Sequence, residues 1–256
     1  MKKTNAALLV AILALLTFAC KKSKSTIAPE SPVNEKRIYT DSLFFIQATD
    51  ATIKPATAQN GTYSSLPEGL RLDQKTGEID VNKSESGLKY RVTFTSASGI
   101  IQHATVIISG INYEDRIYNL SKGDSIAQPI YNGDSKLGLP GSAHTFDENG
   151  GCKKAGILVD KTNAKINLAL SVRSQAIDTG ATEQVKLTYR MNDGSNKALN
   201  SLEVKIYFYR TENEIPKYLS ELLAQRKIIN TTAVSAVART LAVPRSRPPC
   251  IIVVSR

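Results

Sequence analysis

The sequence predicts an all-β protein of two tandem β-sandwich units, the second of which contains one short helix. Three observations predict this class: hydrophobic residues alternate with polar ones, turn residues separate the alternating runs, and one hairpin pattern occurs twice. The chain has 256 residues, of which 41% are apolar and 22% are charged. These are ordinary values for a globular protein, so they exclude wholesale disorder, a collagen-like repeat and a multi-span membrane protein.

The first twenty residues have the pattern of an export signal. Lys2 and Lys3 precede the apolar run from Ala6 to Leu16, which is too short for a bilayer core of about 30 Å. The small Ala19 before Cys20 resembles the lipobox of bacterial lipoproteins, although its usual leucine is replaced by threonine. We therefore predict a signal peptide over residues 1–19 and lipidation of Cys20, with plain secretion as the alternative.

A polar tether is predicted to follow the lipidated cysteine, over residues 20–38. It is rich in Ser, Pro, Lys and Glu and almost without large apolar residues, which is typical of a flexible linker. We predict the first sandwich over residues 39–112 and the second over 113–256, because polar residues begin near Asn112 after a predicted strand ends.

Alternation is clearest in three runs. In the segment from Ile101 to Ile108, the even-numbered residues are predicted to face the core and His103 to face solvent. The runs 185–190 and 204–209 alternate in the same way, and Asn192-Asp193-Gly194 between them has turn chemistry. These two runs are predicted to form an antiparallel pair.

The repeated pattern spans residues 69–81 and 156–168, which align without gaps and share Gly, Asp and Ile in place. It predicts a hairpin in each unit, with the aspartate capping the turn and a left-handed residue before the second strand. Gly77 suits the left-handed position in the first copy. In the second copy Ala164 aligns with that glycine, and Asn163 is the expected left-handed residue.

The segment from Leu66 to Ile79 resembles the GLxLDxxTGxI hairpin of bacterial immunoglobulin-like and cadherin-like adhesion domains. This resemblance covers the first unit well and the second only through the aligned segment. It implies immunoglobulin-like β-sandwiches with binding or spacer roles, often found in Gram-negative lipoproteins behind a short tether. No catalytic residue belongs to the motif.

Two elements are expected near the C-terminus. Pro216 suits the first position of a helix, in which a set of apolar residues would share one face: Tyr218, Leu219, Leu222 and Leu223. The apolar run from Cys250 to Val254 is predicted to be a buried closing strand that pairs within the second sandwich.

The two histidines are the first candidates for catalysis or metal binding. His103 is predicted to be an exposed strand residue. His144 is the candidate residue of a hydrolase, and a purely structural loop is the favoured alternative. A zinc site is disfavoured because the loop lacks the repeated ligand spacing of such sites. The same loop also contains Ser142, Asp147, Glu148 and Cys152. We assign no catalytic residue and no metal ligand, and we expect no cofactor.

Cys152 and Cys250 remain after lipidation of Cys20. Three states are open for them: a disulfide, a reactive thiol, or two buried free thiols.

Two further sets of residues have both a functional and a structural interpretation. Calcium binding is an alternative to turn capping for the acidic hairpin residues, which are Asp73, Asp80 and Asp160, together with Asn167. A sugar-binding platform is an alternative to strand packing for the tyrosines of the predicted pair, which are Tyr189, Tyr207 and Tyr209. Capping and packing are the favoured alternatives.

The net charge of +10 lies at the ends of the chain, in the signal, the tether and the segment 227–256. Residues 38–226 contain equal numbers of acidic and basic side chains, so the charge does not indicate nucleic-acid binding. The expected partners are a membrane, through the N-terminal lipid, and an unknown protein or glycan ligand.

The function expected from these observations is that of a non-enzymatic binding or spacer lipoprotein in the cell envelope. Outer-membrane anchoring facing the periplasm is expected, because lysines follow Cys20 where surface-exported lipoproteins often carry acidic residues. Two alternatives remain, a carbohydrate-binding accessory protein and a hydrolase that uses the His144 loop.

Overall fold

The computed structural model describes residues 37–175, 180–231 and 248–255. The predicted signal peptide, Cys20 and most of the tether lie outside these residues. Within the described segments no helix is both long enough and apolar enough to cross a membrane.

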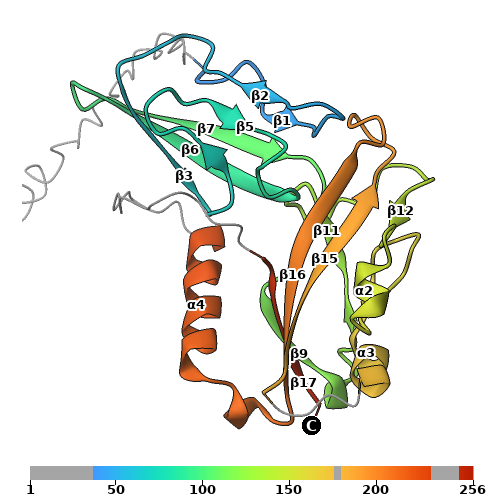
Figure 1. Ribbon diagram of the computed structural model, residues 1–256. Coiled ribbons are helices and arrows are strands. Elements are labelled where there is room, and N and C mark those ends of the chain that lie inside the picture. The colour runs from blue at the N-terminus through green and yellow to red at the C-terminus, as the bar shows by residue number, and fades with distance from the viewer. Residues whose placement is uncertain (1–36, 176–179, 232–247, 256) are drawn as a thin grey trace, which may run out of the picture. The chain divides into compact units, whose positions relative to one another are not determined.

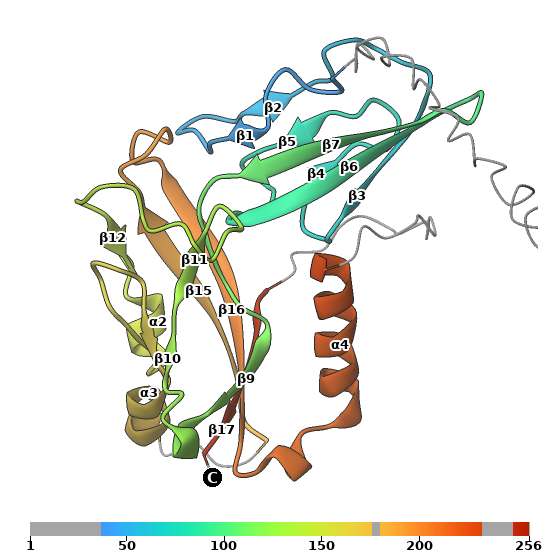
Figure 2. The same ribbon diagram turned by 180° about the vertical axis from the view of Figure 1, so that it is seen from behind.

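The first part of the described chain contains two sheets that enclose one core (Figures 1 and 2). Its strands are β1 (Leu43–Phe44), β2 (Thr52–Ile53), β3 (Gly61–Leu66), β4 (Arg71–Leu72), β5 (Ile79–Asp80), β6 (Leu88–Ser96) and β7 (Ile101–Ile108). One sheet has the order β1-β7-β6-β3 and the other β2-β5-β4. Phe94 and Val106 from the first sheet and Ile79 from the second lie in the same hydrophobic cluster. We call this part the first β unit.

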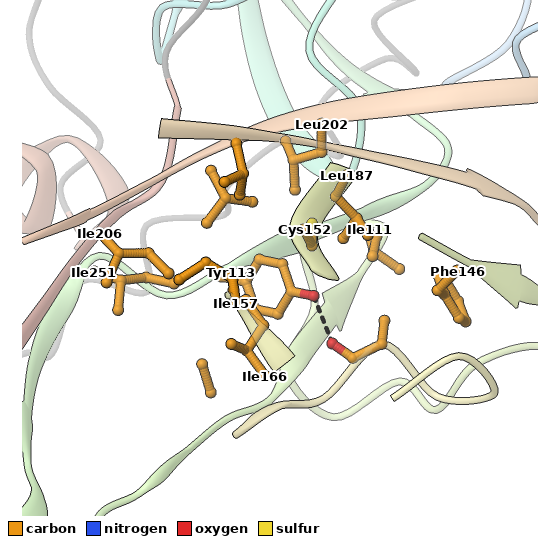
Figure 3. Close-up of a cluster of buried hydrophobic side chains, with 14 of the residues drawn as sticks. Ile111, Tyr113, Phe146, Cys152, Ile157, Ile166, Leu187, Leu202, Ile206 and Ile251 are labelled. Atoms are coloured by element: carbon orange, nitrogen blue, oxygen red, sulfur yellow. Dashed lines mark hydrogen bonds between the residues drawn. The ribbon is translucent and has the colours of Figure 1, made fainter. Parts of the chain in front are cut away.

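The second β unit, from Ile111 onward, has a larger sheet of the order β12-β15-β16-β17-β9. Its strands are β8 (Ile111–Tyr113), β9 (Arg116–Asn119), β10 (Ile126–Ala127), β11 (Pro129–Tyr131), β12 (Thr145–Phe146), β13 (Leu158–Val159), β14 (Ile166–Asn167), β15 (Thr182–Arg190), β16 (Leu199–Tyr209) and β17 (Cys250–Val254). Two smaller sheets, β10-β14-β13 and β11-β8, complete it. Its core, part of which is drawn in Figure 3, takes residues from both the large sheet and the small ones.

The structure contains more helix than expected. Its helices are α2 (Gly151–Lys154), α3 (Leu168–Gln175) and α4 (Lys217–Thr231), with 3-10 turns at Leu120–Lys122 and Glu212–Glu214. The first two α-helices are short and flank the second copy of the repeat, where no helix was predicted. Strands nevertheless dominate, and the fold class is confirmed as all-β with sandwich-like units.

The predicted alternation is confirmed in the run 101–108 but only in part in the other two runs. Thr188, Tyr207 and Tyr209 were expected on the polar face and are buried. Val106 and Ile108 are buried while His103 is exposed. β15 and β16 form the predicted antiparallel pair, with Val185 opposite Val204.

The repeated hairpin is confirmed, and the structural repeat is longer than the aligned sequence. Arg71 pairs with Asp80 in β4 and β5, and Leu158 pairs with Asn167 at the same place in β13 and β14. A third strand joins each hairpin in equivalent register, with Thr52 opposite Asp80 and Ile126 opposite Asn167. The two units therefore repeat a three-stranded sheet, although the third strands share no obvious sequence pattern.

Two side chains outside the aligned segment support each hairpin in the same way. Ser84 Oγ accepts the N–H of Arg71, and Ser171 Oγ accepts that of Leu158. A tyrosine from the start of each unit donates its hydroxyl to the turn. These bonds run from Tyr39 to the carbonyl of Gly77 and from Tyr113 to the carbonyl of Ala164, the latter drawn as a dashed line in Figure 3.

The prediction that Asn163 is the left-handed residue of the second hairpin was wrong. Ala164, with φ of 60°, and not Asn163, adopts the left-handed conformation of Gly77. The N–H of Ala164 bonds to the Asp160 carbonyl as that of Gly77 bonds to Asp73. These bonds fix the turn register, so the alanine takes the glycine conformation despite its Cβ.

The predicted closing strand β17 is confirmed, and it pairs differently from the edge strand of the first unit. In the first unit β1 pairs directly and in parallel with β7, the last strand of that unit. In the second unit β17 lies between β16 and β9 and is parallel to both. All five residues of β17 are buried, because the core covers one face and α4 the other.

Helix α4 is confirmed and begins at Lys217, one residue after the predicted first position at Pro216. Its packed face is narrower than expected. Leu219 is buried, and Leu222 and Leu223 pack against Tyr207, Tyr209 and Ile252 in a third hydrophobic cluster. Tyr218 is 60% exposed, so its assignment to the packed face was wrong.

The two main cores divide between Ile108 and Ile111, and both lie in one compact unit of the chain, Arg37–Arg256. The predicted domain boundaries near residue 112 stay a prediction, because the compact unit is not separated there.

Candidate functional site

The polar side chains of the loop around His144 make structural contacts with the main chain. The two carboxylate oxygens of Asp147 accept the N–H groups of Cys152 and Lys153 at the start of α2, at 2.9 and 3.1 Å. His144 is buried, and its Nδ1 accepts the N–H of Asn192 at 3.1 Å. The loop residues thus hold the start of a helix and the β15–β16 turn.

The other histidine and the acidic turn residues also have structural partners. His103 is exposed and bonds Thr93 Oγ1 at 3.0 Å. Asp73 Oδ1 accepts the N–H groups of Lys75 and Thr76, which lower the pKa of the Asp73 carboxyl. Asp160 accepts from Thr162 in the equivalent turn. Among the described residues, no group of three or more His, Cys, Asp or Glu side chains could hold a metal ion.

Cys152 and Cys250 are both reduced in this structure and are not joined by a disulfide. Cys152 belongs to the core of the second unit, and Cys250 to the cluster under α4, on the other face of the large sheet. Burial raises the pKa of the Cys152 thiol to about 12. This thiol is therefore protonated and shielded rather than reactive.

The tyrosines of β15 and β16 do not form an exposed platform. Tyr189 is fully buried in the core, while Tyr207 and Tyr209 are covered in the α4 cluster. Strand packing, the favoured alternative, accounts for all three.

A polar groove of about 560 Å³ lies where a loop of the first unit meets the β15–β16 hairpin. One wall is formed by Gln47, Ala48 and Asn82 of the first unit. The other is formed by residues of the hairpin: Arg190, Asn196, Lys197, Leu199, Asn200 and Ser201. Buried Ile46 and Ala198 also line it, and both are packed into the core of the first unit.

The first wall is held by its own hydrogen bonds. Asn82 Nδ2 donates to the carbonyls of Gln47 and Thr49, and its Oδ1 accepts the N–H of Gln47. This wall is therefore preformed, and its amide groups are largely occupied.

The second wall supplies the charge of the groove. Arg190 Nε bonds Glu148 at 3.0 Å and its Nη1 bonds the carbonyl of Lys197. The hydrogen bond from Thr145, together with Arg190, holds the pKa of Glu148 below its ordinary value. Lys197 forms no ion pair with another described residue. Since no carboxylate lines the groove, its lining favours anionic or hydroxyl-bearing groups.

Buried polar contacts beside the groove connect the two units. Tyr189 Oη lies 2.7 Å from Ser86 Oγ and accepts the N–H of Ile111 at 3.2 Å. Ser109 Oγ donates to Asp193 at 3.0 Å. Buried groups that are paired in this way hold their elements in one arrangement, which keeps the two walls of the groove in register.

Sequence reasoning missed the groove. It identified Asn192-Asp193-Gly194 as a turn, but the lining residues lie on both sides of that turn, at Arg190 and from Asn196 to Ser201, and face a loop far away in the sequence. The only local signal was the run of polar residues from Asn192 to Ser201, which is also typical of an ordinary turn.

No protein family matches the sequence, and no curated protein does. Among solved structures, the human desmocollin-1 ectodomain aligns over 63% of this chain and 34% of its own length, with 11% identity and a TM-score of 0.23. Drosophila N-cadherin EC1-4 aligns over 65% of this chain and 47% of its own, with 12% identity and a TM-score of 0.20. The chain thus spans about a third to a half of these ectodomains, and the β-sandwich assignment depends on its own strands.

Proposed function

We propose that this protein is a non-enzymatic lipoprotein of the bacterial cell envelope that binds a protein or glycan ligand in its polar groove. The observation that supports binding is the preformed cavity of about 560 Å³ with cationic and amide side chains and no carboxylate in its lining. This volume is within the usual range for ligand sites.

The anchoring part of the proposal depends on the sequence. The export signal and the alanine before Cys20 support lipidation, and the lysines after Cys20 support outer-membrane anchoring that faces the periplasm. The lipid would be the membrane partner, and the polar tether would hold the β units clear of the bilayer.

Cys20→Ser is expected to move the protein from the membrane fraction to the soluble fraction, because the acyl chains would be lost. Fractionation and immunoblotting measure this, with Ser23→Ala as the control that keeps the lipidation site. An undiminished membrane pool in Cys20→Ser would overturn the proposed anchor.

Binding in the groove is tested by filling it. The mature chain is used for affinity capture from envelope extracts and on a glycan array, beside Ser201→Trp, which places a large ring in the groove. Ser98→Trp, at an exposed hairpin tip, is the control. Ligands retained by the control and lost by Ser201→Trp support the proposal, whereas ligands retained by both variants place binding elsewhere.

The carbohydrate-binding alternative is favoured by one observation, the amide and hydroxyl side chains of Asn196, Asn200 and Ser201 in the lining. Groove-dependent signals on the glycan array alone would favour it. The hydrolase alternative has less support, because Asp147 and His144 are engaged by main-chain N–H groups.

A further inference from the structure

The groove contains an unpaired strand edge. β16 runs from Leu199 to Tyr209, but β17 pairs only with its second half, from Lys205 onward. In the described parts of the chain, no other strand besides β15 and β17 is a neighbour of β16. The outer edge of β16 from Leu199 to Val204 therefore has no strand partner there, and its first three residues line the groove.

The start of β17 at Cys250 has a local cause. Pro248 and Pro249 precede Cys250, and proline has no N–H with which to continue the ladder. The last ladder contact is the bond from the Lys205 N–H to the Pro249 carbonyl, at 3.2 Å.

That bond also shows which groups face the unpaired edge. Because main-chain groups alternate in direction along a strand, Ser201 and Glu203 direct their N–H and C=O groups to the same edge as Lys205. The Ser201 N–H is bonded to the adjacent Asn200 Oδ1 at 2.7 Å. A single side-chain oxygen thus occupies the place that a partner strand's carbonyl would take.

We propose that this edge binds an extended, acidic peptide segment of another protein as an added β-strand. This inference depends on the proposed function and specifies the ligand of the same groove. Strand addition supplies main-chain hydrogen bonds, and side-chain pockets supply specificity. The acidic character follows from Lys197 in a lining without carboxylates, since Arg190 is already paired with Glu148. A glycan is less well suited, because no aromatic side chain in the lining offers a stacking surface.

The experiment selects random peptides displayed on phage with the full mature chain, carrying Cys20→Ser to remove the lipid. Selected peptides are expected to be rich in Asp, Glu and β-branched residues and poor in proline. Binding of the synthetic peptides is then measured by calorimetry, together with hydrogen exchange of the outward Ser201 and Glu203 amides, which are expected to become protected.

Two protein variants, one control variant and one modified peptide separate the parts of the proposal. Lys197→Glu is expected to weaken binding roughly fivefold to tenfold, while Lys136→Glu, an equal charge change outside the lining, leaves it unchanged. Glu203→Pro removes an outward N–H and is expected to weaken binding about tenfold. N-methylation of alternate peptide amides tests the same bonds without altering the protein, should Glu203→Pro fail to fold.

Each outcome decides between the two proposals. Acidic peptides that require both Lys197 and unmethylated amides support strand addition. Strand addition is overturned if the selected peptides bind equally well to Lys197→Glu and after N-methylation, or if a glycan binds in a groove-dependent way. The proposed function then stays in place. If neither peptides nor glycans depend on the groove, both proposals fail.

Discussion

At the scale of single residues, equivalent hydrogen bonds hold the two hairpins. Tyr39 and Tyr113 each donate to the carbonyl of the left-handed turn residue, at 2.7 and 2.5 Å, although only the turns themselves align in sequence. A donor this far from the turn has no local signal. The aspartate caps, by contrast, were predictable, because an aspartate bonds N–H groups two and three residues ahead.

Tyr113→Phe is expected to destabilise the fold by about 1 to 2 kcal/mol, since it leaves the buried Ala164 carbonyl without its donor. Urea unfolding measures the change, and Tyr218→Phe at an exposed position is the control. A midpoint equal to that of the wild type would contradict the role given to this bond.

Native Cys152 and Cys250 are expected to resist alkylation by iodoacetamide at neutral pH, because both are buried, at 1% and 2% exposure. Both thiols should react fully in denaturant without prior reduction, which intact-mass measurement detects. Failure to react in unreduced, denatured protein would demonstrate a disulfide and contradict the structure at this point.

At the scale of elements, the positions of β17 and α4 determine which residues of the second unit are buried. α4 covers the face of β16 that the alternation assigns to solvent, which is why Tyr207 and Tyr209 are buried. Asp115 fastens the start of β17, where its Oδ1 accepts the N–H of Cys250 at 2.7 Å and pairs with Arg226 of α4. The sequence predicted a buried strand and a helix but not that they share a face.

Deletion of residues 250–256 is expected to destabilise the second unit severely. β9 and β16 would both lose their hydrogen bonds to β17, and α4 would lose the strand that it covers. Thermal melting followed by circular dichroism measures this. Deletion of only Ser255 and Arg256 is the control and should have a small effect. An unchanged melting temperature after the longer deletion would contradict the assignment of β17.

At the scale of the whole molecule, buried hydroxyls occur in both cores and where the units meet. Burial raises the pKa of Tyr118 and of Cys152 to about 12 each, and it also raises the pKa values of Tyr39, Tyr113 and Tyr189 above the ordinary tyrosine value. Tyr189 bonds Ser86 and the Ile111 N–H between the units. Ionisation of these groups therefore opposes both packing and the connection of the units.

The fold is expected to lose stability in alkali. These acids have higher pKa values in the folded state than in the unfolded state, where tyrosine titrates near about 10. The tyrosine contribution is complete below about pH 9 and that of Cys152 below about pH 7.5, and both are lost as the pH rises toward about 12. Urea midpoints between these pH values, together with tyrosinate absorbance, measure the loss. A constant midpoint would contradict it.

The β class, the two hairpins, the β15–β16 pair and the buried closing strand could be predicted from local sequence patterns, because alternation and turn residues act over a few neighbouring positions. The groove, the parallel insertion of β17 between β9 and β16, the burial of Tyr207 and Tyr209, and the reduced state of both cysteines emerge from the folded chain. Each of these depends on which distant segments pack together. A polar residue in a turn, such as Lys197, has the same local sequence signal whether it faces open solvent or the wall of a cavity.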